Sequence, residues 1–148
     1  MSASGREVLT AFLQALGAQD FATLEHLIHP DYVGEYPQSR ERFRGFAAFR
    51  AQLEQYPGGP PPEAQTGLED ALLLGGEDRW VITPGYTVLP LAGPDRYTAV
   101  VRTVYPDGAA WHIVTIVDLR DGLIHRSTTY FAPEFEAPEW RQGLTERY

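Results

Sequence analysis

The chain has 148 residues, of which 43% are hydrophobic and 22% charged, and its formal net charge is −8. This size and balance fit a single globular domain over residues 1–148 that can bury a core of its own. An acidic chain without a run of Lys and Arg lacks the clustered positive charge that binds phosphate backbones, so we expect no nucleic acid partner. The absence of cysteine excludes disulfides, thiol nucleophiles and cysteine-ligated metals.

The sequence also shows no pattern typical of membrane insertion or export. No segment approaches the roughly 18 apolar residues of a membrane span. The N-terminal sequence MSASGREVL lacks the basic and then apolar regions of a signal peptide. We therefore expect a cytoplasmic protein with no membrane partner.

The first third of the chain predicts three helices. Ser4 and Glu7 have the spacing of a capping box, and a helical apolar stripe follows until Gly17. Asp20 can cap a second helix that Pro30 ends. The stripe of the first helix consists of Val8, Leu9, Phe12, Leu13 and Leu16.

Between the second and third helices we expect one short strand. Residues 31–36 (DYVGEY) are aromatic and bounded by prolines, which is typical of an edge strand. Residues 37–45 are expected to form a loop. Apolar residues then recur at helical spacing from Phe46 to Tyr56, and a proline follows.

The second half of the chain predicts β-structure. Residues 57–67 are too rich in Pro and Gly for a regular element, so we expect a surface connection. Residues 68–74 and 79–83 flank a turn and predict a hairpin, and residues 86–91 predict a further strand.

Residues 97–131 give the strongest local signal. Two Asp-Gly steps, Asp107-Gly108 and Asp121-Gly122, separate runs of β-branched and aromatic residues, which predicts three antiparallel strands. The helices can cover one face of this meander. The predicted class is therefore α+β, with a hollow between the helices and the sheet.

Alternation separates the two faces of the strand from Trp111 to Arg120. We expect the more apolar face to look toward the helices. The other face is apolar in its middle, where Val100 and Val104 of the neighbouring strand extend it, so a homodimer built sheet to sheet would cover it. The inner set is Trp111, Ile113, Thr115, Val117 and Leu119, and the outer set is His112, Val114, Ile116, Asp118 and Arg120. Asp118 is expected to be solvated.

In the last predicted strand, alternation does not show which set of side chains points toward the helices. His125, Ser127 and Thr129 would form a polar strip on the cavity wall if they point inward. The opposite set, Arg126, Thr128 and Tyr130, is equally polar, so both facings stay open.

The order of elements resembles the nuclear transport factor 2-like superfamily and, within it, the SnoaL-like proteins. The segments that carry the resemblance are HPDYVGEYPQSRERFRG (29–45), YPGG (56–59), DLRDGLI (118–124) and TTYFAPEFEAPEWR (128–141). The resemblance implies a cone-shaped, curved, antiparallel or mixed sheet packed on three N-terminal helices around an apolar cavity, commonly in a dimer. Ketosteroid isomerases, polyketide cyclases, scytalone dehydratases and limonene epoxide hydrolases belong to this superfamily.

The catalytic residues of these enzymes carry over only in part. Where ketosteroid isomerases have their catalytic base this chain has Tyr36, and Phe12 and Thr115 stand at or near their two oxyanion-hole positions, which argues against steroid-type isomerisation. The Arg-x-Asp pattern of limonene epoxide hydrolases fails at Arg102 and Val104. Scytalone dehydratases hold a tyrosine at the place of Tyr36.

Tyr36 is therefore the candidate catalytic residue. Its neighbour Glu35 points to the opposite face of the strand, so only one of the two can enter the cavity. A tyrosine could donate a hydrogen bond to a carbonyl and polarise it. The alternative is an amphipathic ring that simply packs at the cavity mouth, which is the commoner role.

Two charged groups carry weaker hypotheses. His26 and His29 have a helical spacing that could bind a metal, but His29 fits better as a cation at a helix C-terminus, so we expect no metal site and no cofactor. Residues 40–44 could hold an anion at the pocket rim, although alternating charge on a loop is usually solvated.

The sequence thus predicts a protein that binds a small, largely apolar molecule in an internal cavity, and isomerase-, cyclase- or dehydratase-type acid–base chemistry on that molecule is the hypothesis for catalysis. A non-catalytic carrier and a protein-interaction module are the alternatives. The predicted pocket consists of Phe12, Tyr36, Phe49, Trp111, Thr115, Ser127 and Thr129.

Overall fold

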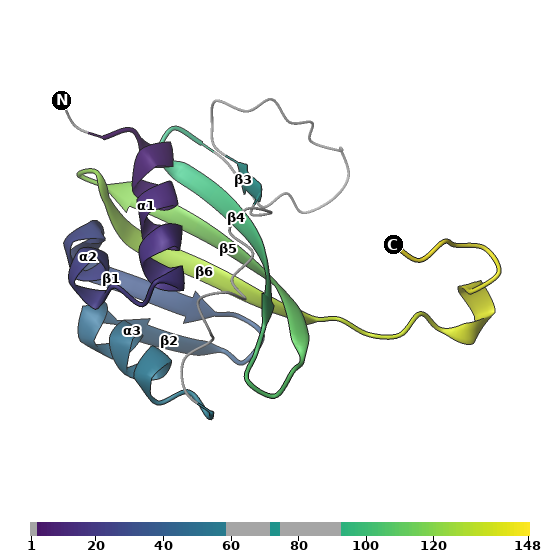
Figure 1. Cartoon of the computed structure of the whole chain (residues 1–148). Coiled ribbons are helices and arrows are strands. Elements are labelled where there is room, and N and C mark those ends of the chain that lie inside the picture. The colour runs from purple at the N-terminus through teal and green to yellow at the C-terminus, as the bar shows by residue number, and fades with distance from the viewer. Residues whose placement is uncertain (1–2, 59–71, 75–92) are drawn as a thin grey trace.

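The structure, a computed structural model, describes residues 3–58, 72–74 and 93–148. Three helices, a six-stranded sheet and a C-terminal 3-10 turn follow one another along the chain (Figure 1). They are α1 (Gly5–Gly17), α2 (Phe21–Leu27), β1 (Ile28–Tyr36), β2 (Glu41–Arg44), α3 (Gly45–Glu54), β3 (Leu72–Leu74), β4 (Arg96–Val104), β5 (Ala110–Arg120), β6 (Leu123–Pro133) and η3 (Glu139–Arg141). None of the described helices is long and apolar enough to cross a membrane.

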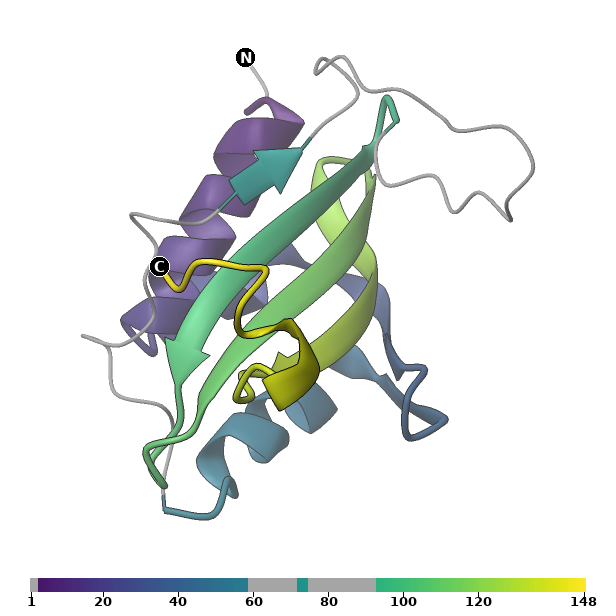
Figure 2. The ribbon, with the colours of Figure 1, turned by 90° about the vertical axis from the view of Figure 1, so that its right-hand side faces the viewer.

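The strands form one mixed sheet in the order β2-β1-β6-β5-β4-β3. Strand β1 runs parallel to β6, and every other neighbouring pair is antiparallel. The three helices lie on one face of this sheet (Figure 2). The predicted α+β class, with a mixed sheet on three N-terminal helices, is confirmed.

The caps that we expected for the first two helices are present in the structure. Ser4 and Glu7 make the reciprocal bonds of a capping box at the start of α1. Asp20 caps α2 by accepting the backbone N–H of Thr23 at 3.1 Å. Helix α3 ends at Glu54, slightly before the predicted end at Tyr56.

The predicted edge strand at residues 31–36 was wrong in its first residue and in its place in the sheet. The second helix ends at Leu27 rather than at Pro30, which lies within β1 where the pairing with β6 changes register between Ile28 and Val33. Proline lacks the backbone N–H that a regular ladder needs, so it is tolerated at an irregularity such as this one. Strand β1 is also interior, between β2 and β6, and not an edge strand.

Residues 37–45 are not wholly a loop. Glu41–Arg44 form β2, which pairs with β1 from Val33 to Tyr36 and takes the edge of the sheet. Because β2 has only four residues, its alternation is too short to be recognised in the sequence.

The meander of β4, β5 and β6 is confirmed. Asp121 and Gly122 both have positive φ, 54° and 75°, as the tightest hairpin turn requires. Gly108 has φ 84° in the preceding turn. Strand β3 pairs with β4, whereas the predicted strands at 79–83 and 86–91 and most of the predicted connection at 57–67 lie outside the described residues.

Candidate functional site

A cavity of about 200 Å³ lies between the inner face of the sheet and helices α1 and α3. Its walls come from α1, α3 and every described strand except β3. They consist of Leu9, Phe12, Leu13, Leu16, Gly17, Gln19, Tyr32, Tyr36, Phe43, Phe49, Leu53, Ala99, Val101, Thr103, Tyr105, Ile113, Thr115, Val117, Ile124, Ser127, Thr129 and Phe131.

Aromatic rings form the side of the cavity next to β1 and β2. The ring of Tyr36 lies 5.2 Å from that of Phe43 and 5.3 Å from that of Phe131, and Phe12 lies 6.0 Å from Phe49. Gly34 makes room for this arrangement, since a Cβ there would come within 2.1 Å of the Phe43 ring. The aromatic side is therefore rigidly packed.

A second part of the cavity lining, here called the hydroxyl wall, carries hydroxyl groups of β5 and β6, and the Tyr32 hydroxyl of β1 joins them. The Ser127 and Tyr32 hydroxyl oxygens lie 2.5 Å apart in a buried hydrogen bond. The Thr115 and Thr129 hydroxyl oxygens lie 3.2 Å apart. Each pair holds two O–H protons and uses one of them internally, so each keeps a second proton for another acceptor.

The described residues that line the cavity include no carboxylate, amine, guanidinium or imidazole group. Their titratable groups are three tyrosines. Burial raises the pKa of Tyr32, Tyr36 and Tyr105 to about 12 in each case. These phenols stay protonated near neutral pH and can serve as hydrogen-bond donors, not as bases.

Tyr36, the candidate catalytic residue, has its side chain on the cavity side of β1. Its hydroxyl donates to the Gln52 Oε1 atom of α3 at 2.9 Å, and Gln52 Nε2 donates in turn to the Ala48 carbonyl at 3.2 Å. Glu35 faces the other way and accepts from Arg126 at 2.9 Å. The proton of Tyr36 is therefore already engaged unless a guest displaces Gln52.

The structure brings six of the seven predicted pocket residues to the cavity. They are Phe12, Tyr36, Phe49, Thr115, Ser127 and Thr129. Trp111 does not line it, because it stands opposite Pro133 at the end of the sheet, beyond Ile113, and its ring packs edge-on against Tyr105 at 6.0 Å. On β6, Ser127 and Thr129 line the cavity, whereas His125 of the same predicted set does not, because the pairing of β6 with β5 changes register between Ile124 and Arg126.

Sequence reasoning missed Tyr32, Phe43, Tyr105 and Phe131. Tyr32 is the most consequential, because it is 3% exposed and makes the buried bond to Ser127. It precedes Tyr36 by four residues on the same strand, so alternation places the two on one face. That signal was present in the sequence.

The two histidines with helical spacing do not share a helix. His26 lies in the last turn of α2, with Nδ1 2.7 Å from the Ala22 carbonyl, whereas His29 lies in β1 and not at the helix C-terminus where we expected it. In the described part of the chain, no three His, Cys, Asp or Glu side chains are placed to hold a metal ion. Among residues 40–44, Phe43 enters the cavity and Arg42 pairs with Glu35 at 3.2 Å.

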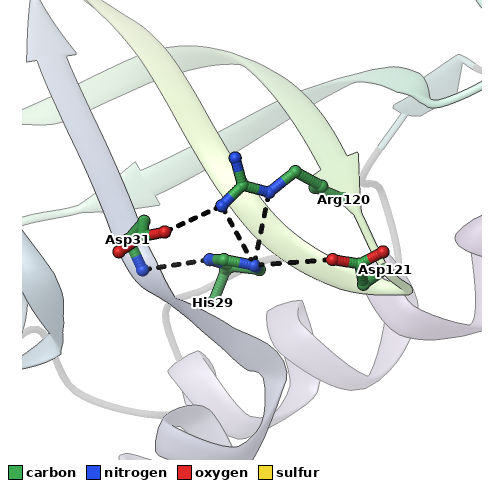
Figure 3. A network of polar contacts seen from close by, with 4 residues as sticks. All are labelled: His29, Asp31, Arg120 and Asp121. Atoms are coloured by element: carbon green, nitrogen blue, oxygen red, sulfur yellow. Dashed lines mark hydrogen bonds and ion pairs between the residues drawn. The ribbon is translucent and has the colours of Figure 1, made fainter.

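His29 belongs instead to a polar network that joins β1 to the turn between β5 and β6 (Figure 3). Its Nδ1 atom accepts the backbone N–H of Asp31 at 3.0 Å, and its Nε2 atom lies 3.8 Å from the Asp121 carboxylate. Arg120 reaches Nε2 of His29 at 3.3 Å and Asp31 at 2.9 Å. None of these residues lines the cavity, so the network positions β1 and not a guest.

A family model described as "SnoaL-like domain" matches residues 9–127. Among solved structures, an NTF-2 like protein of unknown function from Burkholderia xenovorans is 26% identical with a TM-score of 0.65, covering 97% of this chain and 94% of that one. No curated protein matches the chain.

Two further structures share the fold. A candidate ketosteroid isomerase from Kribbella flavida has 23% identity and a TM-score of 0.67, with 99% of this chain and 91% of that one covered. A candidate polyketide cyclase from Pseudomonas putida has 19% identity and a TM-score of 0.60, with 86% and 91% covered.

Proposed function

Because the chain belongs to the SnoaL-like domain family, we propose that its cavity binds one small, largely apolar, uncharged molecule. The observation that carries the proposal is the cavity of about 200 Å³ whose described walls are apolar apart from hydroxyls and one amide. Cavities of about 150 Å³ accept benzene, so a one- or two-ring molecule fits the available space.

The hydroxyl wall supports a guest with one polar group. Thr115 with Thr129 and Ser127 with Tyr32 can each offer a proton to a carbonyl or hydroxyl oxygen. An ionised guest would lose its hydration without gaining an opposite charge from the described walls, which is costly. A neutral ketone or phenol is therefore favoured over a carboxylate or an amine.

Catalysis on this guest is the second candidate function, and the buried tyrosines support it. Tyr32 and Tyr36 keep their protons near neutral pH and could polarise a carbonyl during isomerisation, cyclisation or dehydration. A base would be needed to complete most such reactions, and the described walls carry none. A carrier role is consequently the simpler proposal.

Two probes that differ by one hydroxyl test the binding site. Naphthalene and 2-naphthol are titrated into the protein and into an Ala99→Phe variant, in which the new ring fills the cavity. We expect both probes to bind the parent, 2-naphthol about fivefold more tightly because it gains a hydrogen bond worth about 1 kcal/mol. Binding to the variant should fall at least tenfold.

Equal binding to the parent and to Ala99→Phe, or no binding to either, would contradict the cavity proposal. Mass spectrometry of solvent extracts from protein purified out of its own host would identify a natural guest. For any substrate found in this way, unchanged turnover in Tyr36→Phe and Tyr32→Phe variants would remove both residues from the mechanism.

We also propose that the partner of this chain is a second copy, seated on the outer face of the sheet. Val100, Val114 and Tyr130 are half-buried there in one row across β4, β5 and β6. A self-complementary contact between two such faces is the usual form of a homodimer. The cytoplasmic location expected from the sequence stays a prediction.

A further inference from the structure

The C-terminal segment 134–148, here called the arm, leaves the sheet instead of folding back on it. Figure 1 shows the arm standing well clear of the body. Figure 2, seen from that side, shows it in front of the sheet with the helices behind. The two views together place the arm on the outer-face side, where the proposed second copy would sit.

The root of the arm is fixed to the sheet. The Glu134 backbone N–H donates to the Ala110 carbonyl at 2.9 Å, which extends the ladder between β5 and β6. The Glu134 carboxylate also pairs with Arg102 and lies 3.2 Å from His112 Nε2. Bonds to two neighbouring strands hold the direction in which the arm departs.

The arm has internal structure of its own. Gln142 Nε2 donates to the Ala137 carbonyl at 3.0 Å, and the Leu144 N–H donates to the Arg141 carbonyl at 2.9 Å. Arg147 pairs with Glu136 at 2.5 Å across the turn. These bonds tie the segment into a compact unit that presents a defined surface.

Three large apolar side chains of this unit are exposed. Phe135 is 77% exposed, Trp140 75% and Leu144 79%. Large aromatic side chains bury about 150–250 Å² each when covered, so Phe135 and Trp140 alone could supply roughly half of the ~800 Å² per partner of a standard interface. The remainder is available on the outer face, in the row of Val100, Val114 and Tyr130 that lies one step from the root of the arm.

Charge supports a second copy as the occupant. Arg42 and Arg126 share one carboxylate, Glu35, on the outer face, whereas residues 135–148 contain three Glu and two Arg. An acidic arm is thus suited to the outer face of another molecule. In a two-fold arrangement each copy would offer one arm and receive one.

We propose that the arm clasps a second copy of the chain on the outer face of the sheet, with Phe135 and Trp140 as its main anchors. The proposal rests on the homodimer proposed above and adds a structural role for residues 134–148. Aromatic side chains are the residue type most often found to dominate such contacts.

Sedimentation velocity over a concentration series tests the arm and the outer face separately. We expect the parent chain to be a dimer. A Phe135→Ser/Trp140→Ser variant should raise the dissociation constant at least 100-fold, because two anchors are lost. Tyr148→Ser, which removes an exposed aromatic outside the anchor pair, should leave it within about threefold.

Val114→Arg and, independently, Tyr130→Arg should also give monomers, with circular dichroism to verify that each variant is folded. If the Phe135→Ser/Trp140→Ser variant dimerises as tightly as the parent while Val114→Arg does not, the arm proposal fails and the outer-face dimer stands. A monomeric parent, or a dimer that survives both Val114→Arg and Tyr130→Arg, would overturn both.

Discussion

The two faces of the meander β4–β6 carry different kinds of polar side chain, on alternate residues of the same strands. The inner face has uncharged hydroxyls joined in pairs, such as Thr115 with Thr129. The outer face has ion pairs, such as Arg96 with Asp118, whose Asp118 side chain is 29% exposed rather than freely solvated as expected. Burial accounts for the difference, since a hydroxyl satisfied by one bond is far cheaper to bury than a charge.

This comparison indicates how one sheet can serve two contacts without conflict. Side chains that would meet a guest and side chains that would meet a partner belong to separate faces, so each set can change without altering the other. In the proposed binding site, the aromatic side of the cavity would limit the shape of the guest. The hydroxyl wall would favour a guest with a neutral polar group.

The largest expected effect comes from placing a charge on the inner face. Val117 is 1% exposed, and Val117→Asp would bury a carboxylate without a cation among the described cavity residues. We expect the free energy of unfolding to fall by about 3–5 kcal/mol, as measured by urea denaturation.

The matched control is Val33→Asp on the outer side of β1, where the residue is half-buried and stands opposite Arg44 and Arg126. This variant should lose about 1 kcal/mol or less. Similar losses at both positions would mean that the two faces do not differ in burial in the way described.

The distance in sequence between contacting residues explains how much of the fold could be predicted. The strands β4–β6 were predictable because the turn at Asp121-Gly122 is local and its residues favour positive φ. The interior position of β1 was not, because it depends on parallel pairing such as Gly34 with Ser127, far apart in the chain. No local pattern encodes such a contact.

The site was predictable where one face of a strand is clearly more apolar than the other, as it is for Thr115. The facing of Ser127 and Thr129 was not predictable, because both faces of their strand are equally polar in the sequence. Trp111 followed the same rule as Thr115 yet missed the cavity, because the pattern of one strand does not show where the cavity ends. Phe43 was unpredictable for another reason, since the strand that carries it has four residues and was taken for a loop.

An intermediate effect separates paired from unpaired hydroxyls on the inner face. Thr115→Val would leave Thr129 without its partner, so we expect a loss of about 1–3 kcal/mol in the free energy of unfolding. Thr103 is 3% exposed, and its hydroxyl has no hydrogen-bond partner among the residues that the structure describes. Thr103→Val should therefore be neutral or stabilise by up to about 1 kcal/mol.

Both variants replace threonine by a side chain of nearly the same shape, so urea denaturation compares the hydroxyls alone. A loss at Thr103 equal to that at Thr115 would show that the Thr103 hydroxyl is satisfied in solution, for example by a water molecule.

The smallest expected effect is a pH dependence from His125 of β6, whose ring lies against that of His29. Burial lowers its pKa below the usual 6.5, and the positive charge of Arg120 and the proximity of His29, 5.2 Å away between ring centres, lower it further. Arg126 acts in the same direction, and Asp31 opposes them.

The sign of the effect follows from proton uptake. Below about pH 6.5 the unfolded chain binds a proton at His125 more readily than the folded chain does, so the free energy of unfolding falls as the pH decreases. A His125→Gln variant should show a shallower decrease than the parent between about pH 7.5 and pH 5 in urea denaturation. If the two slopes coincide, His125 does not link folding to protonation.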